Sequence, residues 1–293
     1  MNNLAGYTYP HEHITIDLSG PKRDTDCHLD CFEETAAELR QLYSKGVRNI
    51  IDVTNRGMGR NIPYLLRMEQ ATGLHILCAT GWYKEPFLPA EVGELPVEAL
   101  ANILIRELTE GIDGLKKASV IGEIGSSLRE ITPLEQKIFE AAAIAHKATG
   151  APIITHTTLG ELAYEQLEIF NRYTVDLSKV IISHTALKGD YDYIEGLAKA
   201  GVNIAFDTVG KTSYQPDELR IDFLCRLAEA GYAGQLLMSM DITRKSHLKV
   251  NGGVGYSYLM DSFTPMLLKR GLPPATLEQI MSGNINRILG GTT

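Results

Sequence analysis

Short apolar runs rich in β-branched residues alternate along the chain with longer stretches in which apolar residues recur at helical spacing. Runs of this kind are typical of β-strands, and the stretches between them are typical of amphipathic helices. We expect eight strands, over Tyr7–His13, Arg48–Thr54, His75–Thr80, Ser119–Ile124, Pro152–Thr157, Lys179–His184, Val202–Asp207 and Gln235–Asp241.

The stretches between the strands carry helix signals of their own. In Leu29–Lys45 the apolar residues fall on one helical face, and a glycine directly follows. Thr132–Glu135 offers a capping Thr, a Pro at the first helical position and a Glu three residues past the cap. Asp217–Ala230 shows a similar pattern and is also followed by glycine. These signals predict helices over Leu29–Lys45 and Asp217–Ala230, and a helix that begins at Thr132–Glu135.

Eight alternating strands and helices in 293 residues favour one closed (β/α)₈ barrel, a TIM barrel, as a single domain over residues 1–293. The alternative fold is a doubly wound open sheet. That fold would carry a glycine-rich phosphate fingerprint after a strand, and no expected strand is followed by one. The barrel is therefore the preferred prediction.

Composition places the chain among globular proteins, with 44% hydrophobic and 22% charged residues. A net charge of −8 argues against nucleic acid as a partner, because a nucleic-acid binder usually carries a basic stripe. The sequence shows neither a signal peptide nor an apolar run of about 18 residues, so we expect a cytoplasmic protein without a membrane partner.

Four cysteines are too few for a disulfide framework in a chain of this size. The spacing of Cys27 and Cys31 suits zinc, but no second Cys/His pair with suitable spacing completes such a site. We therefore expect reduced thiols.

In a closed barrel, functional residues gather at the carboxyl ends of the strands. His11 and His13 lie two residues apart on one strand, so their side chains point the same way and can contact one ion. Alone, such a pair would equally suit two hydrogen-bonded polar residues. The polar residues at the other strand ends favour a metal site, and the full candidate set is His11, His13, Glu123, His156, His184 and Asp241.

This set exceeds the three protein ligands that a catalytic zinc usually takes, and it divides into two sites. Two ions about 3.5–4 Å apart can share a hydroxide that is nucleophilic at neutral pH. Asp241 could take a proton from this hydroxide as general base. We expect one ion on His11, His13 and Asp241, another on His156 and His184, and Glu123 giving one oxygen to each.

The remaining histidines are read differently. His28, His75 and His146 are expected to be structural or surface residues, whereas His247 lies in a glycine-containing loop after the last strand, Ile242–Tyr258.

That loop also contains Arg244 and Lys245, and a cationic loop over a barrel mouth would suit an anionic substrate. A solvated loop whose charges contact only water explains the same residues equally well. Lys211, after the seventh strand, could add a further positive charge. Trp82 and Tyr83 could form an apolar wall of the site, or they could serve ordinary loop packing.

Gly57–Asn61, after the second strand, resembles a phosphate loop but lacks the Lys-Ser/Thr pair. We interpret it as a turn in which Arg60 orders nearby loops.

Together, the motifs at the strand ends resemble those of the phosphotriesterase family of the amidohydrolase superfamily, over the whole chain. The matching stretches are His11–His13, Ile121–Gly125, Thr155–Thr157, Ser183–His184 and Ser239–Asp241. The resemblance implies a binuclear centre, commonly of zinc, with the more buried ion on His11, His13 and Asp241 and the more exposed one on His156 and His184. It also implies a closing helix around Asn284–Leu289.

One residue departs from the commonest family pattern. Many members bridge the metals with a carbamylated lysine, whereas this chain has Glu123. Similarity to glutamate-bridged relatives, some lactonases among them, keeps the site intact and makes triester hydrolysis a weaker expectation.

The leading hypothesis is therefore a two-metal hydrolase, with zinc or another divalent ion such as manganese, acting on a phosphoester, carboxyl ester or lactone. Its partner would be a small molecule, an anionic one if the cationic loop contacts it, and the protein would be a monomer or homodimer. The alternatives are a metal-dependent deaminase or amide hydrolase, and a non-catalytic metal-binding barrel.

Overall fold

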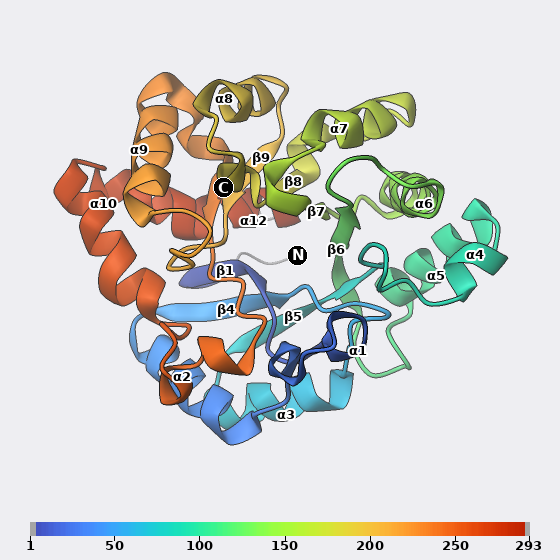
Figure 1. Cartoon of the computed structure of the whole chain (residues 1–293), viewed down its shortest axis with the longest axis horizontal. Helices are drawn as coiled ribbons and strands as arrows, with labels where there is room; N and C mark the ends of the chain where they lie inside the picture. Colours follow the sequence, from blue (N-terminus) through green and yellow to red (C-terminus); the bar gives the residue numbers. More distant parts are fainter. Residues whose placement is uncertain (1–3, 291–293) are drawn as a thin grey trace.

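The computed structural model describes residues 4–290, in which eight parallel strands are surrounded by helices (Figure 1). Each strand pairs with the next one along the chain, which confirms the predicted (β/α)₈ barrel. The strands are β1 (Tyr7–Glu12), β4 (Val47–Asp52), β5 (His75–Thr80), β6 (Ala118–Ser126), β7 (Ile153–Thr157), β8 (Val180–Ser183), β9 (Asn203–Phe206) and β10 (Leu236–Met238).

The helices follow the expected alternation, with short additional ones near the barrel ends. Both halves of the capping box predicted at Thr132 are present, since Glu135 N–H donates to Thr132 Oγ1 (3.3 Å) and Thr132 N–H donates to Glu135 Oε2 (3.0 Å). The helices are α1 (Ser19–Lys22), α2 (Phe32–Ser44), α3 (Ile62–Thr72), α4 (Glu91–Glu94), α5 (Val97–Thr109), α6 (Pro133–Thr149), α7 (Ala163–Arg172), α8 (Tyr191–Lys199), α9 (Asp217–Leu227), α10 (Thr264–Arg270), α11 (Pro274–Glu278) and α12 (Asn284–Leu289).

Several element bounds differ from the prediction. Helix α2 begins at Phe32 rather than Leu29, because His28 and Leu29 form strand β3, which pairs antiparallel with β2 (Ile16–Asp17). Strand β10 ends at Met238, three residues before Asp241, and Asp241 itself has a left-handed backbone (φ 52°) that a regular strand does not contain.

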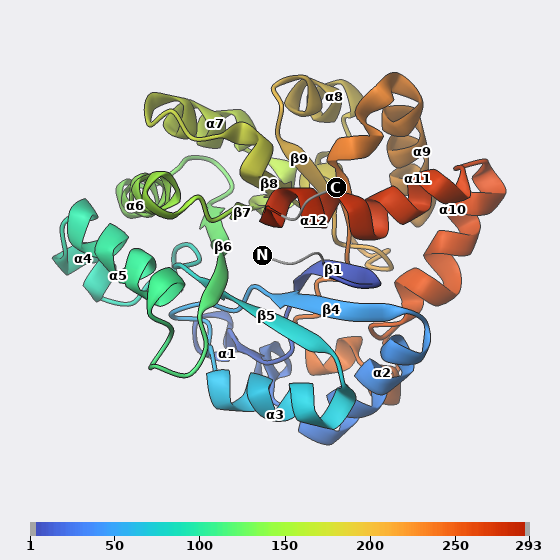
Figure 2. The ribbon, with the colours of Figure 1, turned by 180° about the vertical axis from the view of Figure 1, so that it is seen from behind.

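Apolar side chains fill the barrel interior, and α12 closes one end of it. Figure 2 shows α12 lying across the barrel, which confirms the expected closing helix. Its Ile285, Ile288 and Leu289 pack into the same buried cluster as the interior residues Ile51, Val53, Leu77, Ala79, Val120, Ile154, Ile181, Ala205 and Leu237. The closed end leaves the opposite, carboxyl end of the strands as the place for a site.

Polar side chains join the first and last strands at that open end. The carboxylate of Glu12 accepts hydrogen bonds from Ser239 Oγ (2.7 Å) and from the backbone N–H of Met240 (2.6 Å). Ser239 Oγ in turn accepts from the backbone N–H of His11 (3.2 Å). These bonds hold the two strand ends in register, and with them the side chains of His11 and Asp241.

The four cysteines are free thiols. Cys27 is buried with its thiol directed at Asp24, and Cys31 is half-buried. Within residues 4–290, neither belongs to a group of three side chains able to hold a metal. Over the same residues, no helix combines the length and the apolar character needed to cross a bilayer.

Candidate metal centre

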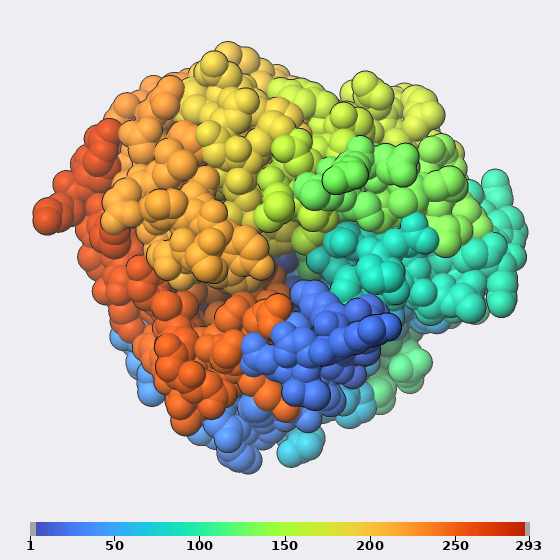
Figure 3. Space-filling model, in the orientation of Figure 1, coloured from blue at the N-terminus to red at the C-terminus, as the bar shows by residue number. Residues whose placement is uncertain are grey.

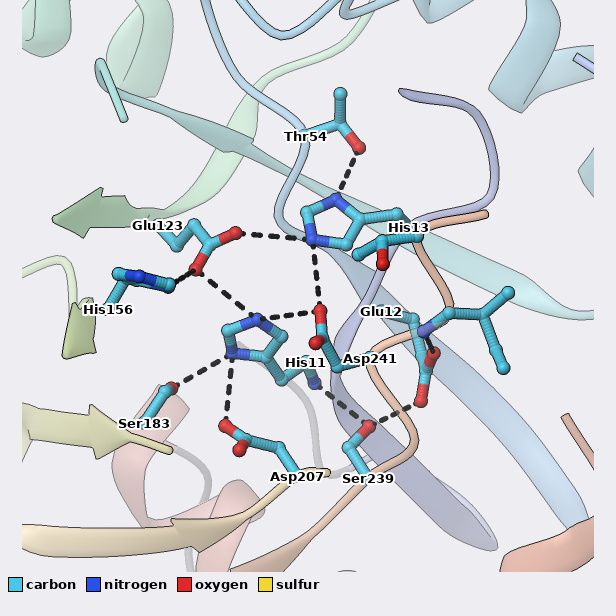
Figure 4. A network of polar contacts seen from close by, with 12 residues as sticks. His11, Glu12, His13, Thr54, Glu123, His156, Ser183, Asp207, Ser239 and Asp241 are labelled. Atoms are coloured by element: carbon cyan, nitrogen blue, oxygen red, sulfur yellow. Dashed lines mark hydrogen bonds and ion pairs between the residues drawn. The ribbon is translucent and has the colours of Figure 1, made fainter. Parts of the chain in front are cut away.

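The six residues singled out at the strand ends converge at the mouth of the barrel. Figure 4 shows five of them, His11, His13, Glu123, His156 and Asp241. They are buried, except for His156, which is partly exposed. Two groups of three have ligand atoms within 4.8 Å of one another, namely His11, His13 and Asp241, and His11, Glu123 and His184.

The first group matches one expected ion site. The second differs from the expected pairing, because it joins Glu123 and His184 with His11. His156 also lies next to Glu123, with its Nδ1 3.2 Å from Glu123 Oε2. Glu123 thus lies between the expected ion site of His11, His13 and Asp241 and that of His156 and His184.

Hydrogen bonding sets the tautomer of His13. Thr54 Oγ1 lies 2.8 Å from His13 Nδ1 and uses its own proton in a bond to the carbonyl of Thr15 (2.9 Å). Thr54 Oγ1 must therefore accept a hydrogen bond from Nδ1–H, and the lone pair of the neutral imidazole is then on Nε2. Nε2 points towards Glu123 Oε1 (3.2 Å) and Asp241 Oδ1 (3.4 Å).

The buried carboxylate of Asp207 does the same for His184 and lies next to the ring of His11. Asp207 Oδ1 lies 2.8 Å from His184 Nδ1 and also accepts from the backbone N–H of His184 (3.1 Å). Its second oxygen lies 3.4 Å from His11 Nδ1, which also contacts Ser183 Oγ (2.9 Å). Carboxylates of this kind commonly orient metal-binding histidines.

Sequence reasoning missed Asp207 as a functional residue. A signal was available, because it ends an expected strand in the same way as the candidate ligands do.

The atoms turned to the centre of the cluster lack hydrogen-bond partners. Among residues 4–290, His11 Nε2, His13 Nε2 and Glu123 Oε2 are buried without a hydrogen bond. Buried polar atoms are nearly always satisfied, so orphaned atoms grouped at one point need a ligand. Imidazole nitrogens and carboxylate oxygens are the donors that zinc and similar divalent ions take, and these residues therefore fit such ions.

The charges in the cluster also favour a cation. Burial alone would raise the pKa of Glu123, but the surrounding histidines outweigh it and hold that pKa well below its usual range. Burial opposes ionisation of Asp241 too, yet Lys211 and His13 keep its pKa well below the ordinary value. For His13, burial lowers the pKa but the two carboxylates raise it to about 10. Two buried anions thus attract positive charge to the Nε2 side of the ring.

The backbone is also unusual at the site. His184 (φ 64°) and Asp241 (φ 52°) both adopt the left-handed region, which costs free energy in residues other than glycine. Hydrogen bonds to Asp207 and Glu12 hold the two segments in place. At Gly122 a side chain is excluded, because a Cβ would lie 2.4 Å from the carbonyl oxygen of Ile154. Glycine thus lets β6 bring Glu123 against β7.

A cavity of about 240 Å³ opens over the cluster. In Figure 3 the face seen has a hollow bordered by the blue N-terminal segment, the teal segment after β5 and the orange segment after β10. Of the expected substrate-binding residues, Tyr83, Lys211, Arg244 and His247 line the cavity.

Trp82 and Lys245 do not line the cavity. Trp82 is fully buried behind it, with its indole N–H donating to Glu91 (2.7 Å). Lys245 lies at the surface in an ion pair with Asp30 (3.0 Å). The structure places Trp82 in ordinary loop packing, the alternative considered for it.

The loop after β10 is less cationic than its sequence indicates. Arg244 is paired with Asp24 (2.7 Å) and lies 3.4 Å from Asp26. His247 Nδ1 accepts from the backbone N–H of Thr243 (3.2 Å), and burial lowers the pKa of His247 to about 4, so the ring is neutral. Lys211 contacts Asp241.

The other histidines lie away from the site. His146 bonds the carbonyl of Ala151 (2.8 Å) and accepts from the backbone N–H of Asp176 (3.3 Å), so its role is structural. His75 is exposed and His28 is half-exposed.

A (β/α)₈ barrel with imidazoles and carboxylates gathered at its strand ends defines a class, the metal-dependent hydrolases built on this fold. The chain belongs to one family of that class, the phosphotriesterase family, whose profile matches residues 2–289. The expected family is thereby confirmed, and with it an enzyme that hydrolyses ester bonds.

Three proteins illustrate the similarity. The chain is 45% identical over 281 residues to the phosphotriesterase homology protein of Escherichia coli, covering 96% of each sequence. The crystal structure of that protein, with phosphate in its active site, matches with a TM-score of 0.95 at 44% identity, over 97% of this chain and 99% of the other.

A lactonase from Listeria monocytogenes matches with a TM-score of 0.92 at 27% identity, over 99% and 96% of the two chains. The N-acetyltaurine hydrolase of Mus musculus is 33% identical over 261 residues, which are 84% of this chain and 74% of that protein.

Proposed function

We propose that the protein hydrolyses a carboxyl ester, lactone or phosphoester with two divalent metal ions, zinc being the first candidate. The observation that carries the proposal is the set of orphaned imidazole and carboxylate atoms beneath the cavity. Glutamate at position 123 and the similarity to a lactonase favour carboxyl esters and lactones over phosphotriesters.

Each candidate ligand contributes to one of two sites. Two ions in this cluster would supply a hydroxide at neutral pH and polarise the substrate oxygen. We assign His11, His13 and Asp241 to one ion, His156 and His184 to the other, and one oxygen of Glu123 to each.

Asp241 is the proposed general base. Its Oδ1 faces the two histidines of β1 and the segment after it, and its Oδ2 contacts Lys211, so it lies between the cluster and the cavity. Lys211 keeps Asp241 ionised and therefore able to accept a proton. The ammonium of Lys211 also faces the cavity, where it can stabilise negative charge that develops on the substrate.

Tyr83 positions the partly exposed ring of the cluster and forms a wall of the cavity. Its hydroxyl lies 3.2 and 3.3 Å from the two ring nitrogens of His156, and the rings meet edge to face. Arg244 and His247 also line the cavity, and we expect them to contact the substrate.

Amide hydrolysis is the second candidate function. It is favoured by the similarity to a protein named N-acetyltaurine hydrolase, whose substrate contains an amide bond. The cluster suits this chemistry as well, because both reactions add a nucleophile to a polarised carbonyl.

A panel of lactones, carboxyl esters, phosphoesters and N-acyl amides, tested on protein loaded with zinc or manganese, would separate the candidates. We expect the highest kcat/KM on a lactone or carboxyl ester. Faster turnover of amides would favour the second function. If protein with two bound ions turned over no member, the proposal would fail in favour of a non-catalytic barrel.

A further inference from the structure

Two lysines at the cavity mouth differ from the other cations there. Lys84 follows Tyr83 in the loop after β5, and Lys22 ends the short helix α1; both line the cavity. Among residues 4–290 neither has a carboxylate within 4.0 Å, whereas Lys211 and Arg244 are paired with aspartates.

Lys84 packs closely against Gly125 at its Cβ, and its ammonium lies near two aromatic rings. Gly125 leaves room for it, since a Cβ at that position would lie 3.2 Å from Lys84 Cβ and 3.3 Å from His156 Cβ. Gly125 therefore lies close to the first carbon of the Lys84 side chain and to that of His156. The ammonium lies 5.6 Å from the centre of the Tyr83 ring and 5.9 Å from that of Phe87.

The partly buried ammonium of Lys84 has few hydrogen bonds and no paired carboxylate within residues 4–290. Its hydrogen bond goes to the backbone carbonyl of Glu85 (3.2 Å). Burial lowers the pKa of Lys84. The negative charge of Glu135 raises this pKa and the positive charge of Lys22 lowers it, and the pKa stays below its ordinary value. The carboxylate of Glu135 is already occupied by four donors, among them Ser127 Oγ (2.7 Å) and the backbone N–H of Thr132 (3.0 Å).

We infer that Lys84 and Lys22 form a subsite that binds a carboxylate or phosphate group of the substrate, separate from the ester bond that is cleaved. The inference rests on the proposed function and narrows its substrate class to anionic esters or lactones. The two lysines line one cavity, and the charge of Lys22 acts on Lys84, so an anion in the cavity can interact with both. Charge-assisted hydrogen bonds of this kind are stronger than neutral ones. Arg244, in contrast, already has its carboxylate partners.

Three phenyl esters with the same leaving group would test the subsite. Phenyl butyrate is neutral, phenyl hydrogen succinate ends in a carboxylate, and phenyl 3-phosphonopropionate ends in a phosphonate. The variant Lys84→Met keeps the aliphatic stem, and Lys84→Arg keeps the charge. Lys188→Met is the matched control, because Lys188 also follows a strand end but is paired with Glu161 (2.5 Å) and does not line the cavity.

We expect Lys84→Met to lower the ratio of anionic to neutral kcat/KM by roughly 10-fold or more, mainly through KM. Lys84→Arg should keep most of the ratio, and Lys188→Met should keep all of it. The anionic ester with the larger loss identifies the preferred group. An unchanged ratio in Lys84→Met, or an equal loss in Lys188→Met, would overturn the inference.

Failure of the ester function can be told apart from failure of the subsite. If wild-type protein with two ions cleaves neither these esters nor any lactone, carboxyl ester or phosphoester of the panel, the proposed function fails. Calorimetric titration of 3-phosphonopropionate, which cannot be hydrolysed, then tests the subsite alone. Binding about 10-fold weaker to Lys84→Met than to the wild type would support it. Equal binding would refute it.

Discussion

Two clusters of charged side chains in the barrel differ in how their polar atoms are satisfied. In the arginine cluster, made of Arg56, Arg60, Glu91 and Glu107, two cations face two anions. Glu107 accepts four hydrogen bonds from Arg56, Arg60 and Thr80 at 2.5–2.9 Å.

The ligand cluster has the opposite character. Its carboxylates lie next to imidazoles whose outer nitrogens are occupied, and its inner atoms have no hydrogen-bond partner. A cluster whose charged groups all pair with one another holds loops together. A cluster whose inner atoms lack hydrogen-bond partners is suited to bind a ligand such as a metal ion. This difference separates structural from functional charge more clearly than residue type does.

Replacing Asp241 with Asn should have the largest effect on function. The amide keeps the size of the side chain but cannot take up a proton, so we expect kcat to fall by about 10³-fold. Steady-state kinetics on the best ester of the panel would measure this, with Glu107→Gln as the control for a nearby buried carboxylate outside the cavity. More than a tenth of wild-type turnover in the Asp241 variant would argue against its role as base.

The Glu107→Gln variant should show the reverse pattern, a loss of stability with little loss of chemistry. Arg60 would lose its carboxylate partner and Arg56 would keep only Glu91, so we expect the free energy of unfolding at pH 7 to fall by about 3 kcal/mol. Urea denaturation with and without bound metal would measure it. A collapse in kcat at full stability would show that the arginine cluster belongs to the active site.

The pH dependence of this loss follows from the pKa of Glu107. Burial would raise that pKa, but Arg60 outweighs burial and lowers it below the ordinary value. The stabilisation is therefore complete above the pKa of the unfolded chain and is lost as pH falls through the folded value. The stability gap between wild type and variant should shrink from pH 7 to pH 3, and a constant gap would contradict the assignment.

A smaller effect is expected from Glu12→Gln, where the first and last strands of the barrel meet. Glu12 accepts from Ser239 Oγ and from the backbone N–H groups of Met240 and Ile242. An amide would turn its own N–H against one of these donors, so we expect a loss of about 2 kcal/mol. Thermal and urea unfolding would measure this loss. An unchanged free energy of unfolding would show that the contact between the first and last strands does not depend on these bonds.

The sequence predicts much of the fold and the ligand set because both follow simple spacing rules. Strand period, capping signals and the position of His11, His13 and Asp241 at strand ends can be identified locally. The pairing of Arg244 with Asp24 could not, because it depends on the segment after β2 folding over the mouth. For the same reason, Lys84 stands out only once the other cations are seen to be paired.

The most direct test of the central claim is the number of metal ions per chain in purified, dialysed protein, measured by elemental analysis. The account predicts two divalent ions in the wild type and in Glu107→Gln, and a clear loss in Glu123→Gln, whose side chain lies between the two sites. One ion or none in the wild type, or two ions retained at full affinity in Glu123→Gln, would contradict it.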